Sequence, residues 1–252
     1  VSFMSGNAGQ QAVILREGGS IGEIYGYVTE GVYGANDFYS DGTPKKGVAV
    51  AGVGEKPGFM KYKDVKEDGA ITSEDRQVIG NTMPDFYGAF GTMLSYKGFD
   101  LNIGFQYSYG NDVYNANYIQ TARFDGLADY NQMDFYKNRW TLDNPTSTQY
   151  ADMSFGTMSS AFVEDASFLR LKTVRLTYTF PSRWLEKTHV IRGLKVYIAG
   201  DNLYTFTKYS GYDPEIHTAQ GAGSMTGVLT SGFDYGAFPL ARTFSIGANF
   251  EF

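Results

Sequence analysis

An acidic loop from Asp64 to Asp75 is the segment of this 252-residue chain in which side-chain type and spacing best suit a metal ion. Asp64, Asp68 and Asp75 take the first, fifth and twelfth positions of an EF-hand type of calcium loop, with Gly69 at the sixth. Calcium prefers clustered oxygen ligands, and a glycine permits the sharp turn that gathers them. Lys66 at the third position, and Asp75 in place of a long glutamate, weaken the match. The loop predicts either a site for Ca²⁺ or another divalent ion, or a turn beside a structural polar network.

Aromatic side chains are frequent in the long segments between predicted strands. Flat rings can stack on the faces of sugars or peptides, and Tyr and Trp are common interface anchors. The candidates for substrate contact are Tyr114, Tyr118, Trp140, Tyr209 and Tyr212. The alternative is that these rings pack the loops against one another and against the rim of a sheet.

The chain lacks the residue groupings that are typical of enzymes. It has no Cys, which excludes thiol catalysis, disulfides and Cys-ligated zinc. His189 and His217 are far apart, and neither belongs to a zinc-binding His pattern. We expect no Gly-x-Ser-x-Gly elbow with a nucleophile. The net charge of −6 and the absence of a basic stripe argue against a nucleic-acid partner. We therefore expect neither an enzyme nor a cofactor, apart from the Ca²⁺ considered above.

Residues 238–252 alternate between apolar side chains and small or polar ones. The apolar positions are Phe238, Leu240, Phe244, Ile246, Ala248, Phe250 and Phe252. Because side chains of a strand point to opposite faces in turn, this strand has one apolar and one polar face. A soluble sandwich could show this pattern, and a membrane barrel requires it, with lipid outside and water inside. The pattern also resembles the carboxy-terminal signal that outer-membrane barrels show to the barrel assembly machinery, with Phe244, Ile246, Phe250 and Phe252 as the candidate signal.

Further segments have strand patterns of the same kind. The clearest are 86–96, 99–107, 162–180 and 194–201. A weaker pattern covers 21–33, and residues near 11–16 are predicted to end one more strand. Lys97-Gly98 predicts a tight hairpin between the first two. The alternation changes parity within 162–180, which a bulge near Lys172-Thr173 would explain. No apolar stretch is long enough for a transmembrane helix. The fold class is therefore all-β, as an antiparallel transmembrane β-barrel.

The predicted connections alternate strictly in length. Short ones cover 17–20, 97–98 and 181–192, and long ones cover 34–84, 110–161 and 207–237. Outer-membrane barrels have short periplasmic turns and long extracellular loops, whereas most connections in compact domains are short. With the carboxy terminus in the periplasm, every short turn lies there and every long loop is extracellular. Six or seven strands are too few to close a barrel, so we expect the chain to be part of a larger one.

Several motifs in a fixed order resemble the SusC/RagA family of TonB-dependent outer-membrane transporters. They lie in Gly18–Tyr27, Pro57–Pro84, Tyr96–Leu101, Glu164–Lys172 and Asp201–Glu215. The resemblance implies that residues 1–252 are the carboxy-terminal part of a barrel of about 22 strands. It also implies that the plug domain and the TonB-contacting segment lie upstream.

The resemblance further implies active uptake of oligosaccharides or oligopeptides across the outer membrane of Bacteroidota. The implied partners are a SusD-like surface lipoprotein, TonB through an upstream segment, and outer-membrane lipid. Two alternatives stay open from the residues alone: a passive porin or adhesin barrel, and a soluble calcium-dependent glycan-binding β-sandwich. The sequence does not define the transported substrate.

Overall fold

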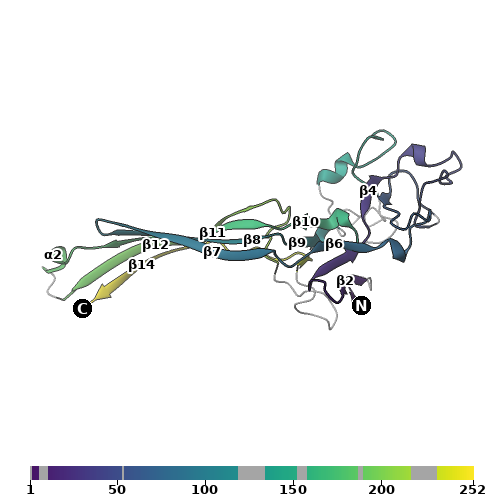
Figure 1. Cartoon of the computed structure of the whole chain (residues 1–252). Helices are drawn as coiled ribbons and strands as arrows, with labels where there is room; N and C mark the ends of the chain where they lie inside the picture. The colour runs from purple at the N-terminus through teal and green to yellow at the C-terminus, as the bar shows by residue number, and fades with distance from the viewer. Residues whose placement is uncertain are drawn as a thin grey trace. The chain divides into compact units, whose positions relative to one another are not determined.

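The computed structural model describes residues 2–5, 11–52, 54–118, 134–151, 158–186, 190–216 and 232–252. The chain divides into two compact units (Figure 1). The wall unit comprises Pro84–Asn111, Asp165–Pro214 and Phe238–Phe252. The loop unit comprises Val1–Met83, Asp112–Glu164 and Glu215–Ala237. Each unit is therefore assembled from three separate stretches of the chain.

Five antiparallel strands form the sheet of the wall unit, in the spatial order β14-β12-β11-β8-β7. Figure 1 shows them side by side as long arrows. Their bounds are β7 (Phe86–Tyr96), β8 (Phe99–Tyr109), β11 (Phe168–Thr179), β12 (Gly193–Thr207) and β14 (Thr243–Glu251). Aromatic and β-branched residues favour these extended strands. The sheet confirms the predicted strands 86–96, 99–107 and 194–201, and the parts of 162–180 and 238–252 that form β11 and β14.

Cross-strand register places most of the apolar side chains of all five strands on one face. Leu176 of β11 lies opposite both Leu101 of β8 and Ile198 of β12. Ile198 in turn lies opposite Ile246 of β14, and Leu94 of β7 lies opposite Leu101. Because directly opposed residues in an antiparallel pair point to the same face, a continuous apolar row crosses the sheet.

A β-bulge in β11 keeps that face continuous along the strands. The register of β11 shifts between Leu171 and Thr173 against both neighbouring strands: Lys172 is an extra residue relative to β8, whereas β12 has the extra residue relative to β11. Opposite it in β12, Asn202 has a φ of 52°, in the left-handed region where Asn is enriched. One inserted residue reverses the alternation, so Val174 points to the same face as Leu171. The bulge predicted near Lys172-Thr173 is confirmed.

The two ends of the sheet differ in their connections. At one end Lys97 and Gly98, with φ values of 48° and 86°, form the tight turn between β7 and β8. The same end holds α2 (Ser182–Leu185), which lies between β11 and β12. At the other end Phe168 lies opposite both Ser108 and Thr207, and there the chain continues into the loop unit. The predicted alternation of short and long connections is confirmed for this sheet.

Short strands form the sheets of the loop unit. One sheet has the order β1-β2-β3-β6, with β1 (Ser2–Ser5), β2 (Gln11–Leu15), β3 (Glu23–Gly26) and β6 (Gln77–Asn81). A second has the order β10-β9-β13, with β10 (Val163–Asp165), β9 (Asp112–Asn115) and β13 (Phe233–Asp234). A two-stranded sheet pairs β4 (Thr29–Val32) with β5 (Met60–Tyr62). Single turns of 3₁₀-helix occur at Ala35–Asp37, Ser73–Asp75, Asp134–Asn138 and Ser160–Phe162. No helix among the described residues is long and apolar enough to cross a membrane.

The segment 21–33, predicted as one strand, is divided between two of these sheets. The division falls at Tyr27, whose backbone N–H donates to the carbonyl of Met158 (2.9 Å). Gly26 lies so close to the same carbonyl that an added Cβ would approach it to 2.3 Å. A distant segment therefore interrupts the strand. The described wall sheet consists of five strands, and the early segments predicted to extend it contribute to the loop unit instead.

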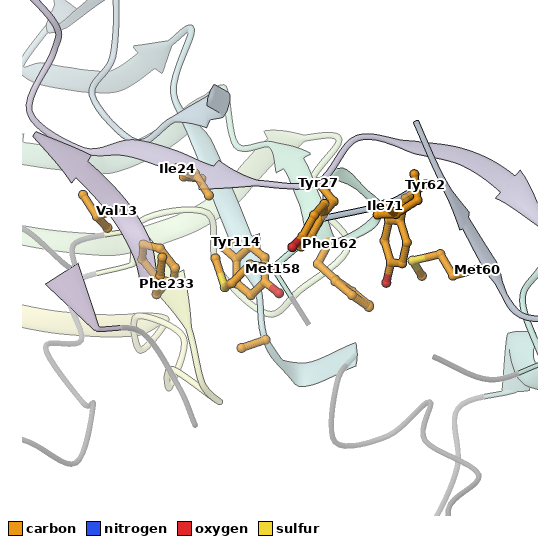
Figure 2. Close-up of a cluster of buried hydrophobic side chains, with 12 residues drawn as sticks. Val13, Ile24, Tyr27, Met60, Tyr62, Ile71, Tyr114, Met158, Phe162 and Phe233 are labelled. Atoms are coloured by element: carbon orange, nitrogen blue, oxygen red, sulfur yellow. The ribbon is translucent and has the colours of Figure 1, made fainter. Parts of the chain in front are cut away.

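A core of aromatic and aliphatic side chains fills the loop unit (Figure 2). Its larger members are Val13, Ile24, Tyr27, Met60, Tyr62, Ile71, Tyr114, Met158, Phe162 and Phe233. The ring of Tyr114 lies 5.3 Å from that of Phe233 and 6.0 Å from that of Phe162, measured between centroids. These three residues come from widely separated parts of the chain. The segments predicted as long loops thus fold together around this core, and Tyr33, Phe38 and Phe59 form a second, smaller cluster.

Candidate functional site

The apolar face of the wall sheet is exposed in this structure. The side chain of Ile246 is 83% exposed, and those of Phe90 and Ile198 are each 55% exposed. Other exposed members are Phe86, Leu94, Tyr96, Phe99, Tyr109, Tyr204, Phe206, Phe244 and Phe250. Water-soluble monomers rarely expose apolar patches larger than a few hundred Å². A sheet face of this extent suits the hydrocarbon of a membrane.

The opposite face of the same sheet is mostly polar, although Tyr87 and Met93 of β7 are also exposed on it. Asn102 of β8 lies opposite Arg175 of β11, and the guanidinium of Arg175 lies 3.8 Å from the ring centroid of Tyr197. At the turn end, the Ser95 hydroxyl donates to a carboxylate oxygen of Asp100 at 2.5 Å. These polar side chains contact one another, and their remaining polar atoms can bind water or a protein surface. The face suits water or a polar protein surface, as the inside of a barrel wall does.

A buried ion pair joins separate segments of the wall unit. Arg170, only 1% exposed, donates from Nη2 to Asp213 and from Nε to the hydroxyl of Thr205 (3.0 Å). Its guanidinium also lies over the ring of Phe168, 5.1 Å from the centroid. The other carboxylate oxygen of Asp213 accepts the backbone N–H of Leu240 (3.1 Å). The pair thereby connects β11 with the stretches that follow β12 and precede β14. Sequence reasoning missed it, because nothing in the pattern links two residues so far apart.

The candidate assembly signal lies on the apolar face of β14. Phe244, Ile246 and Phe250 are opposite Gly200, Ile198 and Leu194 of β12, respectively. Phe252 follows the strand, is 71% exposed, and its ring stacks with that of Phe250 at 6.5 Å. The predicted alternation is confirmed for Thr243–Glu251, whereas Phe238 and Leu240, which were predicted to share its face, precede the strand. Its recognition by assembly machinery stays a prediction.

Three of the five aromatic candidates belong to the loop unit, and they are packed rather than presented to solvent. Tyr114 is fully buried in the core, and Tyr118 packs against the same core. Trp140 is 7% exposed, its Nε1–H donates to the carbonyl of Pro145 (3.1 Å), and its ring covers Gly58. For Tyr114 and Trp140 the structure shows the packing role that was the alternative to substrate contact.

The other two aromatic candidates belong to the wall unit. Tyr209 is 5% exposed, and its ring folds over Gly211, where an added Cβ would meet the ring at 2.4 Å. Tyr212 is 80% exposed and presents its ring outward. The five aromatics therefore belong to different units and do not form a single described site. Substrate contact stays a prediction, which Tyr212 fits best.

Asp75 of the acidic loop is a fully buried structural acceptor. Its carboxylate accepts the backbone N–H groups of Val65 (2.9 Å), Lys66 (3.1 Å) and Thr72 (2.7 Å). Burial alone would raise the pKa of Asp75, but these hydrogen bonds stabilise the charged form more strongly. The pKa of Asp75 is consequently below its ordinary value. A carboxylate used in this way closes the loop onto itself.

The other acidic side chains of this loop also bind backbone groups. Asp64 accepts the N–H groups of Asp68 (3.3 Å) and Gly69 (2.7 Å), and Asp68 accepts that of Ala70 (3.0 Å). Among the described residues, no group of three or more His, Cys, Asp and Glu side chains could hold a metal ion. The geometry matches the alternative of a turn with a polar network. A Ca²⁺ site at Asp64, Asp68 and Asp75 stays a prediction without geometric support here.

One segment fits a nucleophile pattern that the sequence expectation overlooked. Gly18–Gly22 has the residue types of Gly-x-Ser-x-Gly, with Ser20 at its centre. A nucleophile elbow joins a strand to a helix, whereas this turn joins the antiparallel strands β2 and β3. The Ser20 hydroxyl donates to the carbonyl of Ile21 (3.2 Å). The segment is a hairpin turn, and His189 and His217 lie outside the described residues.

Comparisons with known proteins agree with this geometry. The chain is 34% identical to TonB-dependent receptor P3 of Formosa agariphila over 244 residues, which cover 96% of the chain and 23% of that receptor. It is 27% identical to TonB-dependent receptor SusC of Bacteroides thetaiotaomicron over 203 residues, covering 78% of the chain and 18% of SusC. No protein-family profile matches the chain.

Among solved structures, the RagAB peptide importer in its open-open state matches with a TM-score of 0.70. The match has 23% identity and covers 91% of the chain and 22% of the importer chain. This likeness concerns the fold. The chain spans about a fifth to a quarter of the length of the curated relatives it matches. Its sequence relatives, its all-β wall and its order of motifs lead to one conclusion: the chain belongs to the SusC/RagA family of TonB-dependent receptors and forms part of the β-barrel.

Proposed function

We propose that the protein containing this chain is an active transporter of the outer membrane that imports oligosaccharides or oligopeptides. The observation that carries the proposal is the wall sheet, with a continuous exposed apolar face and a polar face behind it. We infer the dependence on TonB from the relatives, which are TonB-dependent receptors. The RagAB importer, which handles peptides, supports a large organic cargo over a small ion.

The proposed partner at the cell surface is a SusD-like lipoprotein, contacted by the loop unit. Support comes from the size of the segments 110–161 and 207–237, which exceeds what joining two strands requires. Removing the first of them would also remove the core residues Tyr114, Ala116 and Met158. A surface substitution is therefore the sharper test. Leu142 is suitable, because it is 84% exposed in the described part of that segment.

The experiment for active transport measures uptake by cells that express the full-length protein. Uptake of labelled oligosaccharides and oligopeptides should stop when the gene is deleted, and also when TonB is inactivated with the protein still in place. Uptake that survives the loss of TonB would indicate a passive porin. A full-length protein that stays in solution without detergent would instead favour a soluble, calcium-dependent glycan-binding protein.

The experiment for the partner compares Leu142→Glu with Asp143→Ala, an adjacent change at an exposed position. Co-purification with the tagged lipoprotein should fall for Leu142→Glu and stay unchanged for Asp143→Ala. Equal recovery for both variants would remove this part of the loop unit from the partner surface.

The proposed orientation puts the turn end of the wall in the periplasm and the loop unit outside the cell. The chain contains no Cys, so single cysteines at Asp41 and Glu186, which are both exposed, give clean labelling sites. In intact cells a membrane-impermeant maleimide should label Asp41→Cys and spare Glu186→Cys. The reverse result would invert the orientation.

A further inference from the structure

The turn end of the wall carries a chain of aromatic rings that leads off the sheet onto α2. The ring of Phe99 lies 4.5 Å from that of Tyr178, and Tyr178 lies 4.9 Å from Phe180. Phe180 meets Trp184 edge-on at 6.2 Å. Phe99 and Tyr178 lie on the apolar face, opposite each other. The rings therefore extend that face to the last residues before the turn.

The helix α2 fixes Trp184 at the end of this chain of rings. Leu185 is 7% exposed and anchors the helix, while Trp184 beside it is 56% exposed. An indole has an apolar body and one N–H donor, so it is most stable where hydrocarbon meets polar groups. Trp184 thus marks a level at which the apolar environment of the wall ends.

Cationic side chains also belong to the segments at this end of the sheet. The Nζ of Lys97 lies 5.1 Å above the ring centroid of Tyr96, and Arg183 and Arg192 are exposed. None of the three cations forms an ion pair within the part of the chain that the structure describes. The nearby exposed carboxylates are Glu186, next to α2, and Glu251, on the polar face. Lys97 is placed over an apolar-face ring, where a long stem can lie on hydrocarbon while the ammonium stays in water.

We propose that Lys97, Arg183 and Trp184 form a binding surface for the phosphate headgroup of an anionic phospholipid. The cations bind the phosphate by charge, and the indole and the rings behind it pack on the glycerol and the first acyl carbons. The surface faces the leaflet at the turn end of the wall. This inference rests on the proposed outer-membrane function and deepens it, since it names the lipid that holds one end of the barrel.

The test uses the full-length protein reconstituted in vesicles of phosphatidylcholine that contain a minor fraction of phosphatidylglycerol. Lipid retained by the purified protein is then measured by mass spectrometry. The wild type should be enriched in phosphatidylglycerol, and Lys97→Gln and Arg183→Gln should each reduce the enrichment about fivefold. Lys97→Arg should retain it, because the charge is kept. Lys46→Gln, at an exposed lysine of the loop unit, is the matched control and should change nothing.

A second measurement places Trp184 without relying on the charge variants. Phospholipid brominated near the headgroup should quench the fluorescence that is lost on Trp184→Phe, and lipid brominated at the acyl terminus should not. Unchanged enrichment in Lys97→Gln and Arg183→Gln would overturn the inference. So would displacement of the phospholipid by lipid A at lower concentration, since the occupant would then be the lipid of the other leaflet. A wild type that does not enter vesicles would overturn the proposed function itself.

Discussion

The wall unit and the loop unit place the same kinds of side chain in opposite surroundings. In the wall, Phe90 and Ile246 are more than half exposed, whereas in the loop unit Ile24 and Phe162 are at most 1% exposed. A water-soluble fold buries its apolar groups in a core because water excludes them. A wall in lipid has no such need, because the acyl chains replace the core. The comparison shows that the two units of this chain are adapted to two solvents, lipid for the wall and water for the loop unit. The alternating pattern of a strand indicates which solvent its side chains contact.

The first prediction tests this contrast by removing one phenylalanine ring from each unit. Phe162→Ala leaves a cavity in the loop-unit core and should destabilise that unit by about 3–5 kcal/mol. Phe90→Ala should cost far less, because lipid chains fill the space that the ring leaves. Hydrogen exchange of the loop-unit and wall peptides in the reconstituted protein separates the two effects. Equal losses would mean that the wall face is packed against protein.

The second prediction concerns the buried ion pair of the wall unit. Arg170→Met leaves the carboxylate of Asp213 buried without its cation and should cost about 3–5 kcal/mol. Replacing both residues, as Arg170→Met with Asp213→Leu, should recover most of that loss, because no buried charge remains. Thermal unfolding in detergent reports both. A double variant as unstable as the single one would show that the Leu240 and Thr205 contacts, rather than the charge, carry the effect.

The third prediction reverses the polarity of the two faces at adjacent positions. Ile246→Arg places a cation on the lipid face and should cost about 2–4 kcal/mol near the middle of the membrane. Ser245→Arg, one residue away, points to the polar face and should cost much less. The same contrast applies to Ile103→Arg and Asn102→Arg on β8. The folded fraction in a urea titration with vesicles measures it, and equal costs would contradict the assignment of the faces.

The fourth and smallest effect is a pH dependence within the loop unit. The pKa of Asp75 is lower in the folded protein than its ordinary value, so the unfolded state binds the proton more readily. The stabilisation is complete above the ordinary pKa of about 3.9 and is lost as pH falls through the folded value. The protection factors of the amides of Val65, Lys66 and Thr72, corrected for the intrinsic exchange rate at each pH, should therefore fall below about pH 4. Asp75→Asn should exchange faster at neutral pH and lose most of this acid response.

The wall was predictable from the sequence, and the loop unit was not. In β14 the alternation from Phe244 to Phe250 in the sequence corresponds directly to the two faces of the strand. The bulge at Lys172 was also predictable, because it changes the parity of the alternation in the sequence. Residues of the loop-unit core, such as Tyr27, Tyr114 and Phe233, show no period. They meet only after distant segments pair, which no local pattern records. The resemblance of the motifs predicted the family. Residue type alone could not distinguish packing from substrate contact for Tyr114 and Trp140, and only the structure shows that both are packed.

The short strand β13 has a consequence for the time course of folding. It follows β7, β8, β11 and β12 in the chain, yet it pairs in parallel with β9, with Phe233 opposite Tyr114. Closing such a long stretch of chain is entropically costly and slow. The loop-unit core therefore stays incomplete, with its tyrosines still open to solvent, until four strands of the wall have been synthesised and exported. A chaperone that protects the unfolded chain in transit would have these exposed aromatic segments as its natural ligands.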